Sequence, residues 1–92
     1  MLFIALLKAK PGASPKETLG RRAAWKYPEG VKQVAEYWPQ TSNPSVIAVF
    51  EAQSIGPIMA VTVTWSDAFD ITVVPAITAE DGLQLAQQMM PS

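Results

Sequence analysis

The sequence predicts an α+β fold with the element order strand, helix, strand, strand, helix, strand, followed by a last helix. Three observations lead to this prediction. The runs Leu2–Leu7 and Val46–Phe50 are apolar at every position, as in strands covered on both faces. In the runs Val31–Trp38 and Phe69–Ala76, apolar and polar residues follow a pattern with a period of two, as in edge strands. Helix-start signals open two of the segments between these runs and the segment that follows the last run.

The first half of the chain contains one predicted helix between two strands. After the opening strand, a Pro-Gly pair breaks the apolar run, and Ser14 begins a capping-box pattern with a proline at the first helical position. We therefore expect a helix from Pro15 to about Lys26, which Pro28 ends. The alternating strand Val31–Trp38 follows the turn.

The second half contains one segment whose local signals disagree. A loop over residues 39–44 leads into the apolar strand that ends at Glu51. In Ile55–Asp67, β-branched residues with a period of two favour a strand, whereas apolar residues at helical spacing favour a helix. We assign a helix, with Ser54 as its N-cap and Pro57 in its first turn, where proline is tolerated.

A strand over Phe69–Ala76 and a helix from Thr78 to about Met90 complete the chain. This order predicts a four-stranded antiparallel sheet, with the first and third strands inside and the second and fourth at the edges. Both crossover helices should cover one face of the sheet, because such connections are right-handed.

The other face of the predicted sheet lacks cover. It carries alternate residues of the first strand, which are either Leu2, Ile4 and Leu6 or Phe3, Ala5 and Leu7. Several hundred Å² of such surface left in water would cost on the order of 10 kcal/mol, comparable with the stability of a small domain. Apart from the last helix, a second copy is the simplest cover. We therefore expect a homodimer or a higher homo-oligomer, with a cleft between the facing sheets.

The composition narrows the possible functions. The 92 residues predict a single domain, residues 1–92, of which 49% are hydrophobic and 16% charged. A net charge of -1 argues against nucleic acid and membrane surfaces as partners. The chain has neither cysteine nor histidine, which excludes disulfides, thiolate nucleophiles, imidazole ligands and Ser-His-Asp triads. We predict no cofactor and no metal site. The apolar N-terminal run is too short to span a bilayer, so we expect a cytoplasmic protein.

The chain resembles an uncharacterised family known as domain of unknown function 3303. The resemblance rests on short motifs spread over nearly the whole chain. They are Met1-Leu2-Phe3, Pro28-Glu29-Gly30-Val31-Lys32, Tyr37-Trp38, Phe50-Glu51-Ala52, Trp65-Ser66-Asp67 with Phe69, and Pro75. The resemblance implies a ferredoxin-like fold of the dimeric α/β-barrel superfamily, with two sheets facing each other across a dimer. It implies no reaction. Relatives often place a histidine after the tryptophan of the second strand, where this chain has Pro39, so no activity of that histidine is carried over.

Two tryptophans are candidate ligand-binding residues. Trp38 and Trp65 have large rings that would supply contact area in a pocket for a flat apolar molecule. In a domain of this size, the more common role of such rings is to fill the core.

The charged candidates each have a functional and a structural interpretation. Glu51 shares a face with two apolar residues of its strand, and a partner covering that face would make its carboxyl a desolvated acid or base. Otherwise Glu51 is a solvated strand end. Asp67 would orient a ligand or form a helix-end turn. Arg21 and Arg22 would bind an anion or lie on a solvated helix face.

Three functions are consistent with the sequence. The first, which we prefer, is a non-catalytic homodimer that binds a small apolar or aromatic molecule in the cleft between its sheets. The second is a cofactor-independent enzyme, similar to a monooxygenase or an isomerase, in which Glu51 or Asp67 abstracts a proton. The third is a structural module that interacts with another protein.

Overall fold

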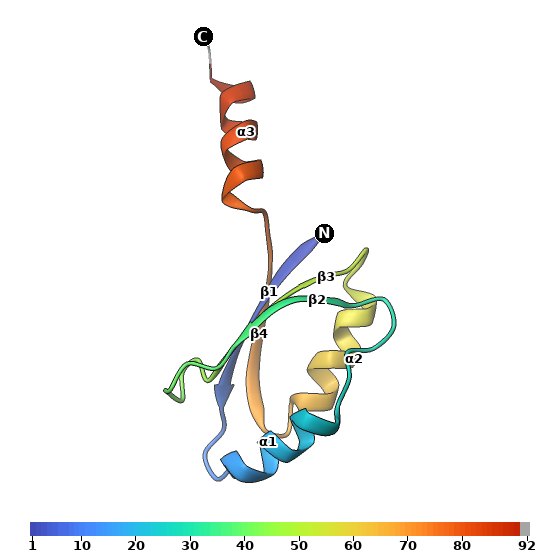
Figure 1. Ribbon diagram of the computed structural model, residues 1–92, viewed down its shortest axis with the longest axis vertical. Coiled ribbons are helices and arrows are strands. Elements are labelled where there is room, and N and C mark those ends of the chain that lie inside the picture. The colour runs from blue at the N-terminus through green and yellow to red at the C-terminus, as the bar shows by residue number, and fades with distance from the viewer. Residues whose placement is uncertain (91–92) are drawn as a thin grey trace.

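The computed structural model describes residues 1–90 and has the element order predicted from the sequence (Figure 1). The strands are β1 (Leu2–Ala9), β2 (Lys32–Tyr37), β3 (Val46–Glu51) and β4 (Phe69–Ala76). The helices are α1 (Pro15–Ala24), α2 (Gly56–Trp65) and α3 (Ala79–Met89). The fold is α+β and of the ferredoxin-like type, with one four-stranded sheet.

The sheet has the strand order β2-β3-β1-β4, and every neighbouring pair is antiparallel. The prediction that β1 and β3 are inner strands and β2 and β4 are edges is confirmed. Strand β2 contains a bulge, because the pairing with β3 skips Val34 between Gln33 and Ala35. A single extra residue moves every later side chain of a strand to the opposite face of the sheet.

Helices α1 and α2 lie on the same face of the sheet, as the right-handed crossovers predicted (Figure 1). On this helix-facing side, Phe3 and Phe50 stack with their ring centroids 6.3 Å apart and form the core together with Ile58 of α2. Trp65 and Phe69 form a second buried cluster beside it. Helix α1 buries none of its ten residues, so the main core lies between the sheet and α2.

The ambiguous segment is helical, as we predicted, over Gly56–Trp65. Tertiary packing explains why the helix is favoured over a strand. Ile58 and Trp65 are seven residues apart and lie on one side of a helix, and both are buried against the sheet. The N-cap prediction was wrong: the cap is Ile55, and no side chain caps the helix. The predicted cap of α1 is confirmed, since Ser14 Oγ accepts the Glu17 N–H at 3.3 Å.

The second face of the sheet has no cover among the described residues. It carries Leu2, Ile4 and Leu6 of β1, whereas Phe3, Ala5 and Leu7 face the helices. Helix α3 projects away from the sheet along the long axis of the molecule and has no buried residue (Figure 1). In residues 1–90, none of the helices combines the length and the apolar character that crossing a bilayer requires.

Candidate functional site

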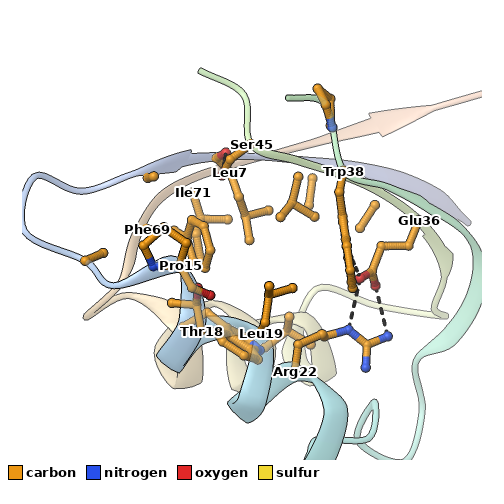
Figure 2. Close-up of a pocket in the computed structure, with 18 of the residues that line it drawn as sticks. Leu7, Pro15, Thr18, Leu19, Arg22, Glu36, Trp38, Ser45, Phe69 and Ile71 are labelled. Atoms are coloured by element: carbon orange, nitrogen blue, oxygen red, sulfur yellow. Dashed lines mark hydrogen bonds and ion pairs between the residues drawn. The ribbon is translucent and has the colours of Figure 1, made fainter. Parts of the chain in front are cut away.

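A cavity of about 650 Å³ lies between the helix-facing side of the sheet and helix α1 (Figure 2). Its lining comes from all four strands, from α1 and α2, and from the loop between β2 and β3. Most of the lining side chains are apolar. Those from the sheet include Ala5, Leu7, Ala9, Val46, Ala48, Phe50, Phe69, Ile71 and Val73.

The cavity exists because the sheet presents small side chains beneath a helix that does not pack closely on it. Ala5 of β1 and Ala48 of β3 are direct cross-strand partners, so two methyl groups lie where larger side chains would meet. Above them, α1 contributes Leu19 and Thr18 to the lining, and Leu19 remains half exposed. The packing of α2 on the sheet keeps the fold together while the space under α1 stays open.

Aromatic rings form much of the cavity wall. Trp25 contacts Tyr27 and Trp65, with ring centroids 4.7 Å and 5.7 Å away. The ring centroid of Trp65 lies 6.1 Å from that of Phe69, and the ring centroid of Tyr27 lies 6.2 Å from that of Phe50. With Trp38, all three tryptophans of the chain line this one cavity. Rings of this size offer large, rigid and flat contact surfaces to a ligand.

One carboxylate, Glu36, forms the polar end of the cavity (Figure 2). Its side chain is only 8% exposed. The Arg22 guanidinium donates to both of its oxygens, from Nε at 3.0 Å and from Nη2 at 3.1 Å. The Tyr27 hydroxyl and the Trp38 indole N–H each donate to it at 2.8 Å. Four hydrogen bonds to an ionised acceptor leave this carboxylate fully satisfied.

The Glu36 carboxylate is held in its charged form. Burial alone would raise its pKa, but the hydrogen bonds from Arg22, Trp38 and Tyr27 outweigh this effect and hold the pKa below its ordinary value. The hydrogen bond to Glu36 raises the pKa of Arg22 against the opposing effect of burial. Burial, and then the bond to Glu36, raise the pKa of Tyr27. At neutral pH the site therefore holds one anion, one cation and a neutral phenol.

The bulge in β2 determines where Glu36 and Trp38 point. Because the pairing skips Val34, Glu36 lies opposite Ala48, whose side chain faces the helices. Without the extra residue, Glu36 would lie opposite Ile47 on the uncovered face. The ring of Trp38 extends from the sheet toward α1 and bounds one side of the cavity, with Phe69 and Pro15 on the other side (Figure 2).

The part of the cavity lining that comes from the β2–β3 loop includes polar side chains but no charged ones. Thr41 Oγ1 donates to the Pro44 carbonyl at 2.8 Å, and Ser45 Oγ donates to the Leu7 carbonyl at 3.2 Å. These hydroxyl donors are engaged, so each hydroxyl offers a ligand only acceptor positions. Within residues 1–90, no group of three or more acidic side chains is placed to hold a metal ion.

The sequence of residues 1–90 matches a family model described as a domain of unknown function (DUF3303). The chain belongs to this family. Searches of curated proteins and of solved structures gave no match. The description of DUF3303 names no activity. The function proposed below for this DUF3303 protein therefore rests on the cavity.

The structure separates the predicted site residues of this DUF3303 protein into two groups. Trp38 and Trp65 both line the cavity, with Trp38 half exposed at its edge and Trp65 buried. Glu51 is exposed at the end of β3 on the uncovered face. Asp67 is exposed just after α2 and pairs with Arg21, whose Nη1 and Nη2 donate to it at 2.9 Å and 3.2 Å. Neither carboxylate lines the cavity.

Glu36, which the sequence analysis did not select, is the most highly connected polar residue of the cavity. A signal for it was present in the sequence. Glu36 is a charged residue two positions before Trp38, so the two share a face of an extended strand, and a charge beside a large apolar side chain indicates a buried partner. The identity of that partner was not readable from the sequence, because Arg22 lies on another element 14 residues away.

Proposed function

We propose that the protein is a non-catalytic binding module that holds a small, neutral, largely aromatic molecule in the cavity between its sheet and α1. The observation that carries this proposal is the gathering of all three tryptophans around one space of about 650 Å³. This volume lies within the range of about 300–1,000 Å³ that is usual for small-molecule sites. The cavity lies on the helix-covered side, whereas the cleft expected from the sequence lies between two facing sheets.

Neutrality of the ligand follows from the charges of the lining. Arg22 and Glu36 are the charged residues among those that line the cavity, and they neutralise each other through two hydrogen bonds. A ligand with a net charge would lose its hydration without meeting a free countercharge, which is costly. A neutral ring loses little hydration energy and gains contact with the aromatic walls.

The enzyme alternative lacks a supporting observation. A proton-abstracting mechanism needs a base within reach of the substrate and free to accept a proton. Glu36 is the carboxylate that lines the cavity, and its oxygens already accept four hydrogen bonds. Glu51 and Asp67 are exposed outside the cavity lining. We therefore favour binding over catalysis.

A matched pair of probes tests the proposal. We expect 1-naphthol, which is neutral at pH 7, to raise the melting temperature, and 1-naphthoate, an anion of similar size, to leave it unchanged. At ten times its Kd, a ligand that binds only the folded protein adds about 1.4 kcal/mol. For a domain of this size that corresponds to roughly 6–11 °C. Equal shifts with both probes, or no shift with either, would contradict the proposal.

A further inference from the structure

Helix α3 has the apolar face of a core-facing helix, but within residues 1–90 it packs on no core. Successive residues of a helix turn by 100°, which places Leu83, Leu85, Ala86 and Met89 on one half of α3. The other half carries its two acidic residues and three glutamines. An apolar stripe of this width is typical of a helix buried along one side. Yet Leu83 is 65% exposed and Met89 is 75% exposed.

This helix is too short to be stable alone. It has eleven residues, and helices below about 12–15 residues are marginal in water without tertiary packing. Gly82 within it lowers the helix propensity further. Its charged residues are confined to the first turn, so ion pairs along its length do not support it. The apolar half of α3 therefore requires a packing surface.

The uncovered face of the sheet is the second unpartnered apolar surface of the molecule. The strand register places on it four residues of β1, three of β2, three of β3 and four of β4. They include Leu6, Tyr37 and Val74, each of which is at least 39% exposed. The charged members of this face are two lysines and two acids, so it is neutral overall.

The α3 helix of the same chain is too small to cover this face. Eleven helical residues are about 16 Å long and about 10 Å wide. Strands of up to eight residues in a four-stranded sheet give a face of about 26 Å by 19 Å. Thus α3 would cover about one third of it. The fourteen residues of the face and the six on the apolar half of α3 make twenty, which is at the lower end of the roughly 20–30 residues that each partner contributes to a stable interface.

We propose that α3 is an arm exchanged between two copies of this chain. In the resulting homodimer the uncovered sheet faces meet, and the apolar side of each α3 packs on the other subunit. A two-fold dimer covers both unpartnered surfaces at once, because each subunit offers the same pair of surfaces.

The connection to α3 favours exchange over folding back. Only Ile77 and Thr78 separate the end of β4 from the first residue of α3. Thr78 is extended, and its side chain accepts the Asp81 N–H at 3.0 Å, so the helix begins directly after this short connection. Figure 1 shows that α3 continues away from the sheet rather than reversing over it. Packing on its own sheet would require a reversal at this capped junction.

The first test measures association. We expect sedimentation velocity to find a dimer at micromolar concentration, and the double variant Leu83→Asp/Met89→Asp to raise the dimer Kd at least tenfold. Val63→Asp is the matched control, because Val63 is 62% exposed on α2 and lies outside the proposed interface. It should remain dimeric. Circular dichroism establishes that all three proteins are folded. A monomeric wild type, or a double variant as dimeric as the control, would overturn the proposal.

The second test distinguishes exchange from folding back. A benzoylphenylalanine photo-crosslinker in place of Leu83 should produce covalent dimers on irradiation, whereas the same group in place of Val63 should not. If the group at position 83 crosslinks only within its own chain, α3 folds back on its own sheet and the arm-exchange proposal is wrong. If all crosslinks join the two chains, the proposal is supported independently of the affinity measurement.

Discussion

Glu36 shows how one residue connects the fold to the cavity. Its carboxylate binds Arg22 of α1, Tyr27 of the segment after α1 and Trp38 just after its own strand. Helix α1 buries no residue of its own, so this network is a main link between α1 and the edge of the sheet. The same network fixes the Trp38 ring at the side of the cavity.

We predict that Glu36→Gln destabilises the protein by about 2 kcal/mol at pH 7. Glutamine lacks the charge that pairs with Arg22, and its amide group turns one acceptor into a donor that faces other donors. The loss is smaller than for a fully buried pair, because Arg22 is 26% exposed. Urea unfolding of the wild type and of Glu36→Gln measures this loss of stability. Glu51→Gln is the matched control, since the exposed Glu51 should change stability by less than about 0.5 kcal/mol.

The pH dependence of stability provides a second test of the contribution of Glu36. The pKa of Glu36 in the folded protein lies below its ordinary value, so the unfolded chain binds a proton more readily. The stabilisation from Glu36 is therefore complete above about pH 5 and is lost as the pH falls below about 4.3 toward the folded-state pKa. We expect the wild type to lose more stability than Glu36→Gln between pH 7 and pH 3. Parallel pH curves for the two proteins would contradict this interpretation.

At the scale of elements, the two crossover helices have different roles. Helix α2 packs into the core through Ile58, which is 1% exposed, and through Trp65. Helix α1 borders the cavity and is attached through its last turn, where Arg21 pairs with Asp67 and Arg22 pairs with Glu36. One helix thus packs into the core, and the other borders an open cavity.

We predict that Ile58→Ala costs about 3 kcal/mol, whereas Leu19→Ala costs less than about 1 kcal/mol. The first substitution leaves a cavity in a packed cluster. The second removes a half-exposed side chain that already borders an open space. Chemical denaturation of both variants measures the difference. Similar losses would show that α1 packs as tightly as α2.

The sequence predicted the elements better than their contacts. The strand order followed from the two apolar and the two alternating runs, and α2 was assigned correctly because Ile58 and Trp65 share a helical side. The position of α3 was not predictable, since local signals give its start and its apolar face but no partner. The bulge at Val34 was not predictable either, and it is the bulge that places Glu36 and Trp38 in the cavity.

At the scale of the whole molecule, the helix-covered and the uncovered sides of the sheet are distinct. The side under α1 and α2 contains the core and the aromatic cavity. The other side and α3 offer apolar surface that we assign to a second copy. The two proposals therefore use different residues, and failure of one leaves the other standing. The sequence indicated surplus apolar surface but not the cavity, because the pairing of Ala5 with Ala48 appears only in the register.

The most direct test of the cavity's role is a titration followed by NMR. Each tryptophan contributes one indole N–H signal, and all three tryptophans line the cavity. With 1-naphthol we expect all three signals to shift together with a single Kd. In Ala48→Leu, whose larger side chain occupies the floor of the cavity, none should shift, whereas the control Ala60→Leu on the exposed side of α2 should behave like the wild type. Unmoved indole signals in the wild type, or equal shifts in Ala48→Leu, would contradict the account.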